Sequence, residues 1–332
     1  MSRAPAALAA AVLATACAGP APQGVTLGDG RYAMGTVLEV TLRARDEASG
    51  RAALEDLFAE AERLDALLTR FAETSELSRL NRAAGRGPIS VDPSLADLLS
   101  RSIAYAALTR GAFDVTVGPL VALWTEAARR GKLPSEEELA RAQALVGAGS
   151  LRVVGATSAE IARPGVSVDL GGIAKGYALD RMLPLLRARG IRDALLNFGQ
   201  SSTWALGAPD GGGGWRLLAR GAGDDLLGVV TLRDQALSIS GSLGQFVEIE
   251  GRRFGHVLDP RTGEPLTRRR QALVVAPEAA LAEALSKALL ILGPEEGVAL
   301  VASRPGCHGL LVDAEGGRHA TPGWEALFSP LP

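Results

Sequence analysis

A glycine-rich segment in the middle of the chain has the residue types needed to bind an anion. Residues 169–180 read DLGGIAKGYALD, so two glycines follow an apolar strand and Lys175 stands in the first turn of an expected helix. Free backbone N–H groups and the positive end of the helix dipole attract negative charge at such a turn, and the ammonium group adds a full charge. The same glycines also suit an ordinary turn between a strand and a helix.

Four other short stretches carry residues that can take part in binding or catalysis. They are Met34-Gly35-Thr36, Ala112-Phe113-Asp114, residues 256–263 (HVLDPRTG) and the segment from Glu283 to Lys287. His256 is a candidate general base, because an imidazole titrates near neutral pH. Simpler explanations are a bulged strand for the first stretch, a turn within the third, and a structural role for a lone histidine.

Helices and short strands must position these residues. Apolar residues recur with helical spacing over residues 51–71, and end signals predict helices over 93–109, from Ser135 onwards, from Gly172 to near Gly190, over 278–292 and over 294–303. Strands are expected over 32–43 and within 151–170 and 191–275. Helices in the first half and strands in the second, without regular βαβ alternation, predict an α+β fold.

The composition excludes some classes of function. The formal net charge of the 332 residues is −2, so no global charge favours binding to nucleic acid. The chain has three histidines and two cysteines, which disfavours a zinc site built from these residues. A metal would more readily be Mg²⁺ on oxygen ligands.

The N-terminus has the features of a signal peptide. Residues 1–17 contain Arg3, an apolar stretch too short to span a bilayer, and Cys17 at the place of a lipoprotein cysteine. We expect a lipoprotein on the periplasmic side of a bacterial membrane, with a soluble periplasmic protein as the alternative. Residues 18–30 are expected to form a flexible linker, and residues 31–332 one domain. If Cys17 carries lipid, Cys307 has no partner for an intrachain disulfide.

Three runs in fixed order resemble the hallmark motifs of one family. DLGGIAKGYALD, FDVTVGPL (113–120) and HVLDPRTGEP (256–265) resemble those of the FAD:protein FMN transferase (ApbE) family. The resemblance covers nearly all of residues 31–332 and implies a two-lobed α+β fold with FAD held between the lobes. It also implies an enzyme that moves the FMN moiety of FAD through a phosphoester bond onto a Thr or Ser of a target flavoprotein, releasing AMP.

The resemblance assigns roles to individual residues. It implies that Phe71 packs against the flavin, that Lys175 contacts the flavin nucleotide, and that His256 is the general base. The partner it implies is a flavoprotein with an acceptor Thr or Ser, such as a subunit of a membrane redox complex. The residues that it places around FAD are Met34, Phe71, Ala112, Phe113, Asp114, Asp169, Lys175 and Val257.

The implied magnesium site departs from the family pattern. The family holds Mg²⁺ with the backbone carbonyl at Gly172 and with Asp and Thr at the positions of Glu283 and Lys287. Glutamate can ligate Mg²⁺, whereas an ammonium group has no acceptor and repels the ion. Two interpretations remain open: a helical salt bridge between Glu283 and Lys287, or a Lys287 that takes over part of the work of the metal.

Two further departures bear on activity. The usual Gly-Gly-Asp run reads Gly199-Gln200-Ser201 and therefore lacks a carboxylate, and Thr-Ser-Gly reads Ile239-Ser240-Gly241 and lacks a hydroxyl. The alternatives to a transferase are therefore a flavin-binding or assembly protein of the same fold with reduced transfer, and a pyrophosphatase that hydrolyses FAD to FMN and AMP.

Overall fold

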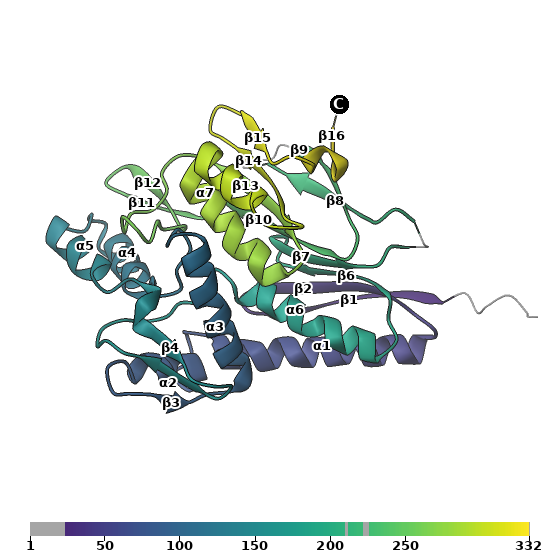
Figure 1. Ribbon diagram of the computed structural model, residues 1–332, viewed down its shortest axis with the longest axis horizontal. Coiled ribbons are helices and arrows are strands. Elements are labelled where there is room, and N and C mark those ends of the chain that lie inside the picture. Colours follow the sequence, from purple (N-terminus) through teal and green to yellow (C-terminus); the bar gives the residue numbers. More distant parts are fainter. Residues whose placement is uncertain (1–23, 210–211, 222–225, 332) are drawn as a thin grey trace, which may run out of the picture.

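An antiparallel sheet of eight strands runs through the structure, a computed structural model that describes residues 24–209, 212–221 and 226–331 (Figure 1). The strand order is β1-β2-β6-β7-β10-β13-β14-β15. The bounds of these strands are β1 Val25–Ala33, β2 Thr36–Ala44, β6 Asp193–Phe198, β7 Ser202–Leu206, β10 Gln235–Gly241, β13 Gln271–Ala276, β14 His308–Val312 and β15 Arg318–Ala320.

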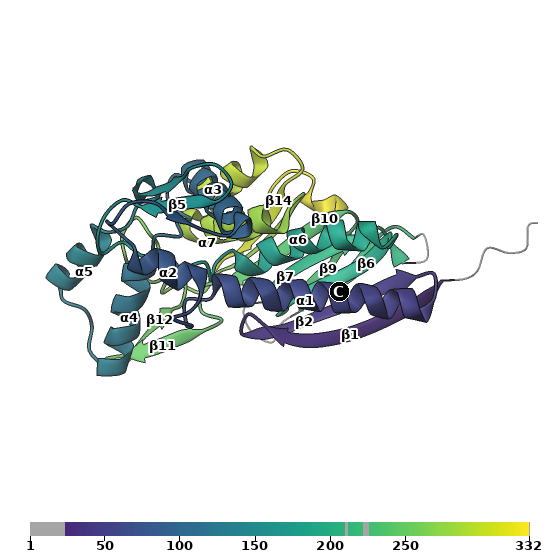
Figure 2. The same ribbon diagram turned by 90° about the horizontal axis from the view of Figure 1, so that it is seen from below.

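Three long helices cover one face of this sheet. They are α1 (Glu47–Leu68), α6 (Ala174–Ala188) and α7 (Ala279–Ala302). Helix α1 packs on β1 and β2, α6 on β6 and β7, and α7 on β10, β13 and β14. Figure 2 shows α1 and α6 side by side along the sheet, and α6 also contacts α7. The N-terminal part of α6 and the middle of α7 are thus held on one rigid support.

A smaller sheet covers part of the opposite face. It consists of β8 (Trp215–Arg220), β9 (Leu226–Leu232) and β16 (Phe328–Pro330), in the order β16-β9-β8. The central strand β13 is buried on both sides, because Ala272 and Val274 belong to the core under the helices and Leu273 and Val275 to the core under the small sheet. This explains why β13 is a continuous apolar run after Gln271.

The remaining elements gather beyond one end of the large sheet, on the left in Figure 1. Strands β3, β4 and β5 form a small sheet in the order β3-β5-β4, and β11 and β12 form a hairpin. The bounds are α2 Glu76–Arg82, α3 Pro93–Leu108, α4 Gly118–Arg130, α5 Glu136–Gln143, β3 Ile89–Ser90, β4 Leu151–Val153, β5 Ser158–Ile161, β11 Phe246–Ile249 and β12 Arg252–Gly255, with a short 3₁₀ turn at Ala148–Ser150. A second 3₁₀ turn, Trp324–Ala326, lies apart from this group, beside β14 and β16.

The predicted α+β class is confirmed, and so are most of the helices. Asp92 caps α3 by accepting a hydrogen bond from the backbone of Ser94, and Ser135 and Glu138 form the predicted capping box of α5. The helices expected over 278–292 and 294–303 follow each other across a kink at Gly293, whose φ is 82°. Helices α2 and α4 were not predicted.

The strand predicted over residues 32–43 is wrong as a single element. Met34 and Gly35, with φ angles of 49° and 77°, form a two-residue turn between β1 and β2. Positive φ at both central residues is the geometry of a hairpin turn that suits the twist of antiparallel strands. Met34 therefore lies at a hairpin tip, and the alternative of a bulged strand is also wrong.

The predicted lipoprotein segment lies outside the described residues, Cys17 included. Cys307 is a buried free thiol. Within residues 24–209, 212–221 and 226–331, the helices are either too short or too polar to cross a membrane.

Candidate functional site

The glycine turn before α6 is fixed by hydrogen bonds to distant segments. The Asn81 side chain donates to the carbonyl of Val168 at 3.0 Å and accepts from its N–H at 2.8 Å. The N–H of Asp169 donates to the carbonyl of Val115 at 2.8 Å, and the Asp169 carboxylate accepts from Gly171 N–H at 2.8 Å. The N-cap residue Ile173 gives no side-chain hydrogen bond to the start of α6. The end of α6 therefore keeps its attraction for an anion.

Lys175 lies in the first turn of α6, as predicted. Its Nζ atom donates to the Oγ atom of Ser201 at 2.5 Å, in the loop between β6 and β7. Ser201 stands where the family pattern has a carboxylate, so the ammonium charge of Lys175 is not neutralised by this partner. A positive group is thus held beside the free end of the helix.

Helices α6 and α7 meet closely at Gly176 and Asp180. A Cβ atom at Gly176 would lie 2.5 Å from the carbonyl oxygen of Ala279. Asp180 accepts from the N–H groups of Ala279 at 2.7 Å and Ala280 at 2.9 Å, and so caps α7. Burial raises the pKa of Asp180 to about 6, against the effect of these hydrogen bonds. The contact sets the spacing between Lys175 on α6 and the residues of α7.

The salt bridge between Glu283 and Lys287, one of the two open interpretations, is not formed: no hydrogen bond or ion pair joins their side chains. Instead, Ser202 donates a short hydrogen bond to Oε1 of Glu283, and Oε2 is buried without a hydrogen-bond partner among the described residues. The Lys287 side chain lies against the glycine turn, since a Cβ at Gly172 would be 3.8 Å from its Cε atom. Burial lowers the pKa of Lys287, the charge of Glu283 raises it, and that of Lys175 lowers it.

Buried hydroxyl groups surround Ser286, between Glu283 and Lys287. Its Oγ atom lies 3.0 Å from that of Ser238 and 2.8 Å from that of Ser240, and it donates to the carbonyl of Glu283 at 3.0 Å. These contacts tie α7 to β10. Ser240 therefore has a structural partner, although the family's preceding threonine is Ile239 here.

His256 lies directly after β12 with part of its side chain exposed. Its Nδ1 atom is 3.1 Å from the carbonyl oxygen of Gln245. Because a carbonyl only accepts, Nδ1 carries the hydrogen atom, and Nε2 of the neutral ring keeps a free lone pair. Burial lowers the pKa of His256, the Gln245 hydrogen bond raises it, and the charges of Lys287 and Lys175 lower it. The ring is therefore neutral at pH 7 and able to accept a proton.

Three predicted site residues are buried next to the glycine turn: Ala112, Phe113 and Asp114. Asp114 accepts from the N–H of Thr116 at 2.8 Å, from its hydroxyl at 2.6 Å, and from the N–H of Ala148 at 2.8 Å. The Phe113 ring lies against Gly172, where a Cβ would be 3.6 Å away. Asp114 thus fixes its own loop, and Phe113 supports the glycine turn.

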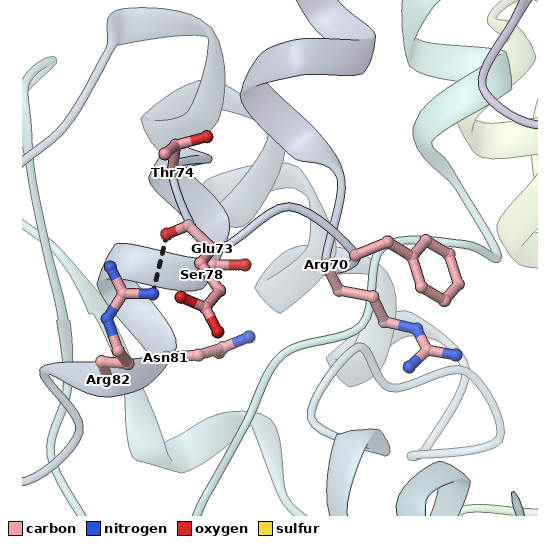
Figure 3. A pocket seen from close by; sticks show the side chains of 7 residues that line it. Arg70, Glu73, Thr74, Ser78, Asn81 and Arg82 are labelled. Carbon is pink, nitrogen blue, oxygen red and sulfur yellow. Dashed lines mark hydrogen bonds between the residues drawn. The ribbon is translucent and has the colours of Figure 1, made fainter.

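A pocket of about 750 Å³ opens beside Phe71 (Figure 3). The Phe71 ring is 82% exposed, and the guanidinium of Arg70 stacks 4.3 Å from its centre. Arg70 also pairs with Asp169 at 2.8 Å, so the pocket is joined to the glycine turn through one ion pair. The lining residues are Arg70, Phe71, Glu73, Thr74, Ser78, Asn81 and Arg82.

The structure brings together only part of the predicted site. His256, Lys175 and Lys287 are close enough for their charges to interact, and the side chains of Phe113 and Lys287 both lie against Gly172. Val257 is buried, and the N–H of Met34 is held at 2.8 Å by Asp65. The sequence did not predict the pairing of Arg70 with Asp169 or the contact of Ser201 with Lys175, because these partners lie 99 and 26 positions apart. The adjacency of Arg70 to Phe71 was the only local signal.

Comparison with known proteins gives a consistent result. The model of the ApbE family matches residues 34–311. A protein of Klebsiella pneumoniae named FAD:protein FMN transferase is 32% identical over 292 residues, covering 85% of this chain and 83% of that protein. One of the same name from Treponema pallidum is 32% identical over 299 residues, covering 84% and 82%.

Solved structures agree with these relatives. The ApbE protein of Thermotoga maritima superposes with a TM-score of 0.81 at 27% identity, covering 92% of this chain and 100% of that one. A mutant of the flavin transferase ApbE from Vibrio cholerae gives 0.81 at 25% identity, covering 91% and 99%.

Proposed function

The chain belongs to the ApbE family, and we propose that it is an FAD:protein FMN transferase, the activity for which its curated relatives are named. The observation that carries the proposal is the cluster at the glycine turn: Lys175 lies in the first turn of α6, and the Lys287 side chain lies against Gly172. His256 is near enough for the charges of both lysines to lower the pKa of its ring. A pyrophosphate needs positive charge, and an attacking hydroxyl needs a base. The cluster supplies both.

The reaction is a displacement at the phosphorus atom of the FMN half of FAD. The hydroxyl oxygen of an acceptor Thr or Ser forms the new P–O bond, and the P–O bond to the AMP half breaks. AMP leaves with the bridging oxygen, and the hydroxyl proton passes to Nε2 of His256. Little covalent chemistry falls to the enzyme, which must position the groups and neutralise the phosphate charge.

The position of FAD follows from the residues around the turn. In this proposal FAD lies between two lobes, one built on the large sheet and the other on α2 to α5. The exposed Phe71 ring packs against the flavin, which gives a function to an aromatic group that the fold leaves in solvent. The pyrophosphate lies at the start of α6, within reach of Lys175. Met34, Ala112, Phe113, Asp114, Asp169 and Val257 complete the walls.

The acceptor is a flavoprotein with an exposed Thr or Ser, such as a subunit of a membrane redox complex. Delivery to the periplasmic side of the membrane, with Cys17 lipidated, places the enzyme beside such acceptors. In a bacterial host, Cys17→Ser should release the protein from the membrane fraction without changing transfer by the purified enzyme. Membrane association that persists in this variant would contradict the anchor.

His256 is tested by a matched pair of variants. His256→Ala should leave FAD binding nearly unchanged and lower transfer by roughly two orders of magnitude or more, because it removes the proton acceptor. His319→Ala is the control, because the His319 ring lies in β15 and its Nε2 atom contacts the Asp313 carboxylate at 2.8 Å. Covalent flavin on the acceptor is measured against time. Equal rates for the two variants would remove His256 from the mechanism.

A further inference from the structure

The residues present do not fit the magnesium ion that the family pattern implies. Mg²⁺ requires several oxygen ligands in near-octahedral geometry. Lys287 offers none, and Oε1 of Glu283 is already engaged by Ser202. No group of three acidic, histidine or cysteine side chains suited to a metal occurs in the described part of the chain. Of the Glu283 carboxylate, only Oε2 is left without a hydrogen-bond partner among the described residues.

Lys287 has no anionic partner among the described residues and is placed where an anionic ligand could bind. Its Cε atom lies 3.8 Å from the position of a Cβ at Gly172, so the atom that carries the ammonium group lies against the glycine turn. It is half-buried, and no hydrogen bond or ion pair joins it to any residue that the structure describes. Keeping a charge partly out of water without an acceptor is costly, and a bound anion would supply the acceptors.

Two departures from the family pattern change the charge of the site by the same amount as one Mg²⁺ ion. Lys287 in place of threonine adds one positive charge, and Ser201 in place of a carboxylate removes one negative charge. Glu283 in place of aspartate leaves the charge unchanged. Lys175 donates to the neutral Ser201, so its charge also remains available to a ligand.

The use of lysine in this chain is selective. Lysine and arginine together number 35, yet the lysines are only Lys132, Lys175 and Lys287. Arginine serves nearly everywhere else, including the ion pairs of the surface. Two of the three compact ammonium groups thus lie at one glycine turn, where a point charge matches a phosphate oxygen in the space that a small cation would fill.

From this geometry we propose that Lys287 is the resident cation of the site, and that Lys287 and Lys175 bind the pyrophosphate of FAD without a magnesium ion. The inference rests on the proposed function only for the identity of the anion. The ammonium of Lys287 takes the electrostatic role of the metal, and Glu283 remains behind it as a buried countercharge.

The first test measures FAD affinity of the purified full chain, with Mg²⁺ or with a chelator and without acceptor protein. The wild type should bind FAD equally well in both. Lys287→Met removes the charge at similar volume and should weaken binding about tenfold in both conditions. Lys287→Thr restores a family ligand beside Glu283, so its affinity should fall with chelator and recover with Mg²⁺. Lys132→Thr, at an exposed helix end, should match the wild type.

A second measurement needs no variant. Acetylation of the wild-type lysines in the presence of chelator, mapped by mass spectrometry, should show that FAD protects Lys175 and Lys287 but not Lys132. The proposal is overturned if chelator abolishes FAD binding by the wild type, if Lys287→Met binds FAD normally, or if FAD leaves the labelling of Lys287 unchanged. Neither experiment contains an acceptor protein, so both can succeed even if the chain transfers no FMN. Conversely, FAD binding that requires Mg²⁺ would overturn the role of Lys287 and would not bear on the transferase proposal.

Discussion

The close contact between α6 and α7 makes Gly176→Ala the most informative structural perturbation. The new methyl group would lie 2.5 Å from the carbonyl oxygen and 2.7 Å from the carbonyl carbon of Ala279. The neighbour is backbone at the start of a helix, so the two helices must separate. Separation also stretches the hydrogen bonds from Ala279 and Ala280 to Asp180, which measure 2.7 and 2.9 Å.

The expected loss of stability follows from opposing effects. Overpacking a tight contact costs about 1–3 kcal/mol, and weakened hydrogen bonds to a carboxylate add to this cost. Alanine stabilises a helix interior by about 1 kcal/mol relative to glycine, which acts in the opposite direction. We expect a net loss of about 1–2 kcal/mol, or a fall in Tm of roughly 1–3 °C, because the unfolding entropy of about 2 cal/mol/K per residue is large for a chain of 332 residues.

Thermal unfolding followed by circular dichroism and titration with FAD together test this expectation. FAD affinity should fall as well, because Lys175 and Lys287 lie on the two helices that move apart. Gly149→Ala is the control, since a Cβ at that glycine meets nothing within 4 Å. A Gly176→Ala variant with the Tm and FAD affinity of the wild type would refute the view that this contact sets the spacing of the two lysines.

Three further predictions concern titration and binding. Burial raises the pKa of Asp180 to about 6, so its contribution to stability is complete below pH 4 and is lost as the pH rises to about 6. The free energy of unfolding of wild type relative to Asp180→Asn should therefore fall by up to about 3 kcal/mol from pH 4 to pH 7, and parallel pH profiles in denaturant titrations would contradict this. The pKa of His256 is lowered, so kcat/KM should fall only below pH 6.5, as the ring gains a proton. Lys287→Met removes a positive neighbour of His256 and should therefore move the acid limb of kcat/KM to higher pH. An acid limb that does not move in the pH–rate profile would show that Lys287 does not influence the pKa of His256. Phe71→Ala should leave Tm unchanged, because the ring is 82% exposed, and weaken FAD binding about tenfold in a fluorescence titration. Normal affinity would exclude Phe71 from the flavin site.

Local signals in the sequence were sufficient for much of the fold. The caps Asp92 and Ser135 and the glycine turn before Lys175 act within a few residues, so the helices that they begin could be predicted. Helix α4 has no side-chain cap at Val117; the signals it does carry, Pro119 in the first turn and the left-handed Gly131 at the end, were not used in the prediction. The hairpin tip at Met34 was missed because the strand pattern continues through it.

The site depended more on contacts between distant segments. Spacing alone favoured an ion pair between Glu283 and Lys287 within α7. In the folded chain, Ser202 from the large sheet binds Glu283, and Lys287 lies against Gly172. The rule that pairs helical residues four positions apart takes no account of Ser202 and Gly172, which are 81 and 115 positions away from Glu283 and Lys287. The pairing of Arg70 with Asp169 was hidden for the same reason.

The most direct test of the central claim is the intact mass of an acceptor flavoprotein domain after incubation with the enzyme and FAD. We expect the acceptor to gain the mass of one FMN phosphoester on a Thr or Ser and to become fluorescent on a denaturing gel, with one AMP released for each FMN transferred. Free FMN and AMP with an unmodified acceptor would contradict the account and indicate a pyrophosphatase. Intact FAD beside an unmodified acceptor would contradict it and indicate a protein that only binds flavin.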